Sequence, residues 1–240
     1  MKKNKLVLVV SFAILLFFSA CSSHLYFQRK ELILKGKVKE ETTYYVKVKD
    51  NKIPADTTGY FAKYTMIFDP AGNTTKFIKL WDTKQRNDNL VKSENIYTGT
   101  GKNIGYTDIS TFADGDVAEA NFTYKWMNDY QYKIYYETEN RPIAQITLDN
   151  EYRIIQSIYA LGYAQQDSIT NTIQYSFKDD KIEKKKTYIT MSGDGKTAKR
   201  VGILVVKAYD KRGNPTILYY YDDENENQVK EVLFRSYVYY

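Results

Sequence analysis

The sequence predicts an all-β fold, an antiparallel meander that forms either one long curved sheet or an open barrel or sandwich. Apolar and polar residues alternate with period two in several stretches, which is typical of half-buried strands. These stretches are rich in Tyr, Thr, Val, Ile and Phe, which suit a pleated surface. Turn residues punctuate the chain at short intervals, as a meander requires, and no convincing long helix is found.

The alternation is clearest in four stretches. Their expected apolar faces are Tyr44, Val46 and Val48; Tyr60, Ala62, Tyr64, Met66 and Phe68; Ala120, Phe122, Tyr124 and Trp126; and Val232, Phe234, Val238 and Tyr240. Arg235 faces away from the last of these. Residues 154–164 can be read as a helix. Residues 86–110 are rich in Asn, Gly, Thr and Lys, and we expect a long loop there with at most one short strand near Leu90.

The N-terminus has the layout of a secretory signal peptide. Three lysines precede an apolar run from Leu6 to Phe18, and small residues precede Cys21. The run is shorter than the ~20 residues of a spanning helix. Phe18-Ser19-Ala20-Cys21 resembles the lipobox of bacterial lipoproteins, in which the cysteine is acylated and becomes the first mature residue. We therefore expect a signal peptide over 1–20, a lipidated tether over 21–29 and a single β domain over 30–240.

This resemblance implies a membrane partner and a location. Multiple acylation at Cys21 would hold the protein persistently on a membrane of the bacterial cell envelope. No acidic residue directly follows Cys21, which favours the outer membrane on its periplasmic side. The formal charge of +6 includes the three signal lysines, so no nucleic-acid partner is expected. A mean hydropathy of −0.55 disfavours a transmembrane barrel.

The body of the chain lacks the residues of several chemistries. Cys21 is the single cysteine and His24 the single histidine. Disulfides, Cys/His zinc sites and Ser-His-Asp or Cys-His catalysis are therefore excluded from residues 25–240. We expect no catalytic residue, no metal and no cofactor, and a protein that is not an enzyme.

One turn motif recurs. Phe68-Asp69-Pro70-Ala71-Gly72-Asn73 matches Tyr209-Asp210-Lys211-Arg212-Gly213-Asn214, and residues 136–142 form a degenerate copy. Asp accepts backbone hydrogen bonds, and glycine takes positive φ, which predicts a type I turn with a glycine bulge. The spacing predicts a threefold repeat of about 70 residues. The structural turn residues are Asp69, Gly72, Asn73, Asn140, Asp210, Gly213 and Asn214.

These turns resemble the tyrosine-aspartate repeats of RHS-type proteins, which carry aromatic-Asp-x-x-Gly-Asn between strands. The resemblance covers the three turn regions and their flanking strands. Family members repeat the motif every twenty or so residues, whereas it is sparse here, so a closed RHS shell is not expected. The resemblance implies an elongated antiparallel sheet on an envelope protein that contacts carbohydrate.

Aromatic residues are the candidate ligand contacts, because the chain has 24 tyrosines and two tryptophans. Exposed rings mark binding surfaces, whereas cross-strand ladders of tyrosine would only stabilise the sheet. The candidates for binding a glycan or an envelope protein are Trp81, Trp126, Tyr135, Tyr219 and Tyr221. Lys184-Lys185-Lys186 is expected to protect a sheet edge, or to contact anionic lipid headgroups.

Carboxylates supply the alternatives. Residues 222–226 are acidic, but Asn227 stands where a calcium loop needs glycine, so a solvated hairpin tip is expected. Asp114 with Asp116, or Glu137 with Glu139, could serve a hydrolase. The expected function is therefore a non-enzymatic binding module of the envelope. A carbohydrate-active hydrolase and a periplasmic carrier of lipids or other hydrophobic molecules are the alternatives.

Overall fold

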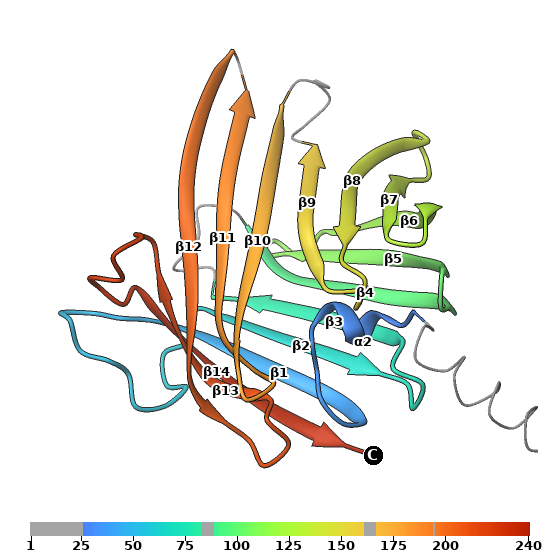
Figure 1. The fold of residues 1–240 in the computed structure, drawn as a ribbon. Helices are drawn as coiled ribbons and strands as arrows, with labels where there is room; N and C mark the ends of the chain where they lie inside the picture. Colours follow the sequence, from blue (N-terminus) through green and yellow to red (C-terminus); the bar gives the residue numbers. More distant parts are fainter. Residues whose placement is uncertain (1–25, 83–88, 161–166, 194) are drawn as a thin grey trace, which may run out of the picture.

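The protein is a closed antiparallel β-barrel of 14 strands with one short helix (Figure 1). This computed structural model describes residues 26–82, 89–160, 167–193 and 195–240. The elements are α2 (Gln28–Glu31), β1 (Val38–Lys47), β2 (Ala62–Phe68), β3 (Thr74–Trp81), β4 (Leu90–Thr100), β5 (Asn103–Phe112), β6 (Val117–Asn128), β7 (Gln131–Tyr136), β8 (Arg141–Leu148), β9 (Ile154–Ala160), β10 (Ser168–Lys178), β11 (Lys181–Gly193), β12 (Lys196–Tyr209), β13 (Pro215–Tyr221) and β14 (Glu231–Tyr239). Among the described residues, no helix has the length and apolar character needed to cross a bilayer.

Strand pairing confirms the antiparallel meander and corrects the expectation of an open sheet. Each strand pairs with its neighbour in sequence, and β1 also pairs with β14, with Thr43 opposite Arg235. This last pairing joins the two ends of the domain, so the barrel has no free first or last strand. Local patterns carry no information on such a distant pairing, which is why closure was not predicted.

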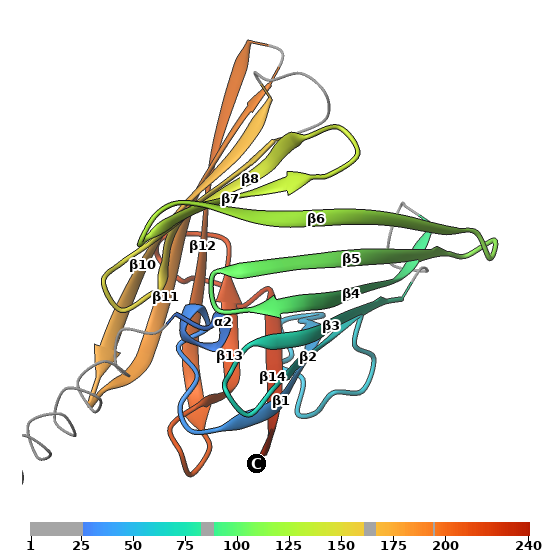
Figure 2. The same ribbon diagram turned by 90° about the vertical axis from the view of Figure 1, so that its right-hand side faces the viewer.

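The two ends of the barrel differ. At the end we call the base, strands are joined by tight turns at residues 69–73, 101–102, 129–130, 149–153, 179–180 and 210–214. β1 starts and β14 finishes at the base. The other end, the mouth, has longer connections such as 48–61 and 222–230. The hairpins β5–β6 and β11–β12 project from the mouth in different directions (Figure 2).

Side chains alternate between the lumen and the outer face of the barrel. In β6 the predicted apolar row of Phe122, Tyr124 and Trp126 lies on the lumen side, where Trp126 packs in the core at the base. In β14 the arrangement is reversed: Arg235 lines a cavity in the lumen, and Val232 is fully buried on the outer side. Period-two alternation thus locates two faces without saying which of them is inside.

Two sequence predictions about particular segments are wrong, and one ambiguous segment is resolved. Residues 86–110, expected to be a long loop, contain β4 and most of β5, which pair along their length. Residues 154–160, the described part of the stretch that could also be read as a helix, form β9, in keeping with the all-β class. The triple-lysine run 184–186 lies in β11, which pairs with strands on both sides and protects no edge. Lys185 faces the lumen instead.

The predicted turn chemistry is present in both full copies of the motif. Gly72 and Gly213 have φ of 98° and 86°, and Asp69 and Asp210 each accept hydrogen bonds from backbone N–H groups of their own turn. Asn140 has a φ of 45°, as expected for the degenerate copy.

The threefold repeat is not confirmed. Five strands separate successive copies, so the turn at 137–140 lies at the mouth while the other two lie at the base. The third equivalent turn at the base is 149–153. It has the same bond from the Asp149 N–H to the Arg153 carbonyl, and Tyr152 at the left-handed position with a φ of 64°.

Candidate functional site

Residues 26–36 fold into the base of the barrel, and we call this segment the plug. Tyr26 and Gln28 are only 6% and 7% exposed. The described part of the predicted tether, residues 26–29, is therefore part of the folded domain rather than a linker. Both ribbon views place α2 within the outline of the barrel (Figures 1 and 2).

The repeated base turns hold the plug. The N–H of Arg29 donates to the Gly72 carbonyl at 3.1 Å. Asn214, which is fully buried, binds both backbone groups of Lys35: Oδ1 accepts from the N–H at 2.7 Å, and Nδ2 donates to the carbonyl at 2.9 Å. The motif residues predicted from the sequence thus have a second role, which is to close the base.

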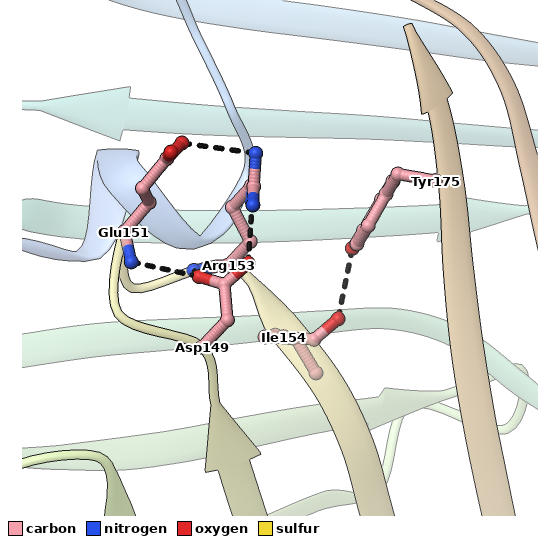
Figure 3. Close-up of polar contacts among 5 residues, drawn as sticks. All are labelled: Asp149, Glu151, Arg153, Ile154 and Tyr175. Atoms are coloured by element: carbon pink, nitrogen blue, oxygen red, sulfur yellow. Dashed lines mark hydrogen bonds and ion pairs between the residues drawn. The ribbon is translucent and has the colours of Figure 1, made fainter.

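The third base turn packs on the plug through Tyr152, whose ring centroid lies 5.5 Å from that of Tyr26. Figure 3 shows how this turn is held: Asp149 accepts from the N–H of Glu151, and Arg153 pairs with Asp149 at 2.5 Å and with Glu151 at 2.9 Å. The Tyr175 hydroxyl of β10 donates to the carbonyl of Ile154 at 3.0 Å, at the start of β9.

Glu31 is the ionisable group at the inner end of the plug. Its Oε1 accepts hydrogen bonds from the hydroxyls of Tyr26 at 2.6 Å and Tyr132 at 2.9 Å. Burial raises the pKa of the Glu31 carboxyl to about 7, and the two tyrosine hydrogen bonds oppose the rise. At neutral pH this side chain therefore holds a proton for a substantial fraction of the time.

The mouth contains a pocket of about 900 Å³, within the usual size range of ligand sites. It lies beside the part of β12 that extends past β13, since pairing between these strands begins only at Ile203. Its lining residues are Lys47, Val48, Tyr188, Ile189, Lys199, Arg200, Val201, Tyr220, Asp222, Glu224, Lys230 and Glu231. Tyr220 lies across Gly202, where a Cβ atom would be 3.0 Å from the ring.

The mouth pocket offers cations that lack acidic partners. Glu224 pairs with Lys186 at 3.1 Å, and Asp222 approaches Lys230 at 3.7 Å. Lys199 and Arg200 are exposed and form no ion pair with any residue in the described ranges. Arg200 lies on the same face of β12 as Gly202 and therefore on the side of the Tyr220 ring, whereas Lys199, the adjacent residue, lies on the other face of the strand. An aromatic ring and an available cation on one face suit a ligand with both a flat surface and negative charge.

The five predicted ligand aromatics do not come together. Trp81 donates to the Tyr64 hydroxyl at 3.2 Å, and Trp126 packs against Tyr26 at the base. Tyr135 and Tyr219 each lie beneath a lysine ammonium, those of Lys125 and Lys207, on strands far apart in the barrel. Tyr221 is only 7% exposed. Their neighbour Tyr220, which was not predicted, is the tyrosine of β13 that lines the mouth pocket.

The predicted carboxylate pairs lie on hairpin tips at the mouth. Asp114 accepts from the backbone N–H of Asp116 within the β5–β6 turn, and Glu139 pairs with Arg141 at 2.8 Å beside the β7–β8 turn. Glu137 lines a pocket of about 430 Å³ between β4, β5 and β6, but Glu139 does not, so the two carboxylates do not face one another across it. In the described ranges, no three His, Cys, Asp or Glu residues are grouped so as to hold a metal ion.

Sequence reasoning missed the charged residues of the lumen. Glu31 stood outside any strand pattern, and Lys185 was hidden in a run of three lysines. Arg235 gave one signal: it sits out of phase with the apolar residues of β14. A charge that alternates with apolar residues was read as facing solvent, whereas in this barrel it faces the lumen.

The fold and these sites define a plugged, closed 14-stranded β-barrel. No family model matches the chain, and no curated protein matches it. Among solved structures it is similar to a porin-like protein from Bacteroides uniformis ATCC 8492, with 10% sequence identity over 85% of this chain and 99% of that one, and a TM-score of 0.33. Because this match is weak, the fold is assigned from the strand pairing of the chain alone. The lipobox, at residues 18–21, lies outside the described residues, and it and the resemblance to RHS-type repeats stay predictions.

Proposed function

We propose that this protein is a lipoprotein of the bacterial cell envelope, anchored through Cys21, that binds an acidic glycan at the mouth of its barrel without chemical turnover. The observation that carries the proposal is the difference between the two ends of the barrel. The segment that follows the lipidation site closes the base, and the large pocket lies at the opposite end.

The anchor and the plug together would orient the molecule. Only residues 22–25 separate Cys21 from Tyr26 in the plug. An extended chain spans about 3.5 Å per residue, so the base would lie within about 20 Å of the membrane. The mouth would then face the aqueous compartment, which we propose is the periplasm.

The outer face of the barrel supports a lipid anchor in place of membrane insertion. Glu119, Asn121 and Lys125 of β6 are exposed and alternate with the lumen-facing aromatic row. On β11, Lys184 pairs with Glu226 on the same outer side as Lys186. A transmembrane barrel needs an apolar outward band about 25 Å tall, and charged rows of this kind would interrupt it.

The mouth supports an acidic glycan over a neutral one. Sugar rings stack on flat aromatic faces, and Tyr220 supplies one on the lumen side of the pocket. Arg200 would pair with a carboxylate or phosphate group of the glycan beside the ring, and Lys199 with a further acidic group of the same polymer across the edge of β12. Because these cations are exposed, we expect the contribution of charge to affinity to fall as salt screens it.

The first test concerns the anchor. We expect Cys21→Ala to move the protein from the membrane fraction to the soluble fraction, because the folded residues carry no other proposed membrane attachment. Fractionation followed by immunoblotting measures this, and intact mass reports acyl chains on the wild type. A Cys21→Ala variant that still sediments with membranes would contradict the anchor while leaving the mouth proposal open to its own test.

The second test concerns the mouth. We expect the double variant Lys199→Ala/Arg200→Ala to bind polygalacturonate at least tenfold more weakly than the wild type, measured by calorimetry at low salt. Lys178→Ala/Lys211→Ala removes the same charge from exposed positions at the base and is the matched control. Equal losses in both variants would show only a general charge effect. Equal binding of neutral dextran would argue against recognition of acidic groups.

A further inference from the structure

A second, separate cavity lies in the lumen between the plug and the barrel wall. Its volume is about 120 Å³. Strands β1 and β9–β14 contribute to its wall, and residues 31–33 of the plug close it from the base. Most of its lining is aliphatic: Leu32, Ile33, Ile154, Ile182, Leu204, Val206 and Leu218.

Two cations reach this aliphatic space. Lys185 extends from β11 and forms no hydrogen bond or ion pair with any described residue. Arg235 extends from β14, and its buried Nε lies 3.5 Å from Glu41 without a hydrogen bond to any described residue. Burial and the nearby Arg235 lower the pKa of the Lys185 ammonium to about 8. The Lys185 ammonium is therefore still mostly charged at pH 7 and lacks a counter-ion.

The acidic groups around the cavity do not neutralise these cations completely. Glu41 forms an ion pair with Arg235 and accepts a hydrogen bond from the Thr43 hydroxyl at 3.3 Å. Glu31 accepts two tyrosine hydrogen bonds and is protonated for part of the time at neutral pH. A buried ammonium without a partner is costly, and a bound anion would remove that cost.

We infer that the lumen cavity binds a short aliphatic monocarboxylate, whose carboxylate pairs with Lys185 and Arg235 and whose alkyl chain packs against Leu204, Val206 and Leu218. Water occupies about 30 Å³ per molecule in the liquid, so the cavity holds about four water-sized groups. That room suits an acid of about three or four carbons. An inorganic anion would leave the aliphatic wall without contacts, and a neutral amide could accept a hydrogen bond from the ammonium but would not balance its charge.

Calorimetric titration of the full chain with sodium butyrate at pH 7 tests this inference. We expect saturable binding with one butyrate per chain. Lys185→Met should weaken it at least tenfold, while the variant itself stays folded, because removing an unpaired buried cation relieves a penalty. Butyramide, which has the same shape without charge, should bind at least tenfold more weakly than butyrate.

Lys184→Met is the matched control, since Lys184 is the adjacent residue, points outward and pairs with Glu226. It should bind butyrate as the wild type does. The inference is overturned by the absence of butyrate binding, by equal binding of butyramide, or by a Lys185→Met variant that keeps wild-type affinity. Tighter binding of phosphate than of butyrate would also overturn it, because the aliphatic wall would then play no part.

Discussion

Replacing Asn214 with alanine is expected to lower the free energy of unfolding by about 3 kcal/mol, because two backbone groups of the plug lose their partner. The amide side chain is fully buried and binds both the N–H and the carbonyl of Lys35. It also contacts the Tyr239 hydroxyl at 2.7 Å. A methyl group replaces none of these bonds, and each buried polar group left unpaired costs roughly 1–3 kcal/mol.

Urea unfolding followed by circular dichroism measures this effect. Asn225→Ala is the control, because Asn225 is exposed in the 222–230 connection, and a change there should stay within about 0.5 kcal/mol. If Asn214→Ala were as stable as Asn225→Ala, the base turns would not hold the plug. The Asp-x-x-Gly-Asn motif would then be explained by hairpin formation alone.

Glu31→Gln is expected to remove a stabilisation that the wild type gains at acidic pH. The ordinary pKa of a glutamate is 4.5, and burial raises that of Glu31 to about 7 in the folded protein. Between these values the folded state holds a proton that the unfolded state has lost. Stability is therefore fully present below pH 4.5 and falls as pH rises through 7, by on the order of 2 kcal/mol.

Unfolding free energies at pH 5 and pH 8 measure this difference for the wild type and for Glu31→Gln. Other groups titrate in both proteins, including Lys185 across the cavity, so the comparison isolates Glu31. We expect the free energy of unfolding to fall less in the variant than in the wild type between pH 5 and pH 8, by on the order of 2 kcal/mol. Glu119→Gln, at an exposed outer position of β6, should keep the wild-type profile. An unchanged profile in Glu31→Gln would mean that the carboxyl titrates as it does in water.

Turns could be predicted from the sequence where their chemistry is local. Asp, Gly and Asn at fixed spacing located 69–73 and 210–214, because one glycine with positive φ decides the turn. Asp149 and Asn150 also predict a turn, but the equivalence of 149–153 to the two glycine turns is not visible in the sequence, because Tyr152 occupies the left-handed position. Packing of its ring at 5.5 Å from Tyr26 and 5.4 Å from Tyr130 offsets the backbone strain, and such packing leaves no local signature.

Strands were missed where the lumen is polar. β4 directs Ser93 and Asn95 inward, and both are buried and donate to Asp108, Asn95 at 3.0 Å. With polar residues on the inner face as well as the outer, the period-two pattern disappears, and the sequence pattern predicts a loop there. The same polar lumen explains why the charge of Arg235 does not mark a position that faces solvent.

The amino-acid sequence by itself determined the all-β class, the antiparallel order and the two glycine turns, because these depend on residues close together along the chain. Only the tertiary structure decided that β1 meets β14, that residues 26–36 close the base, and which face of each strand is inside. These features depend on contacts between residues as far apart as Lys35 and Asn214. Such contacts form only when the barrel closes, so a short stretch of sequence does not reveal them.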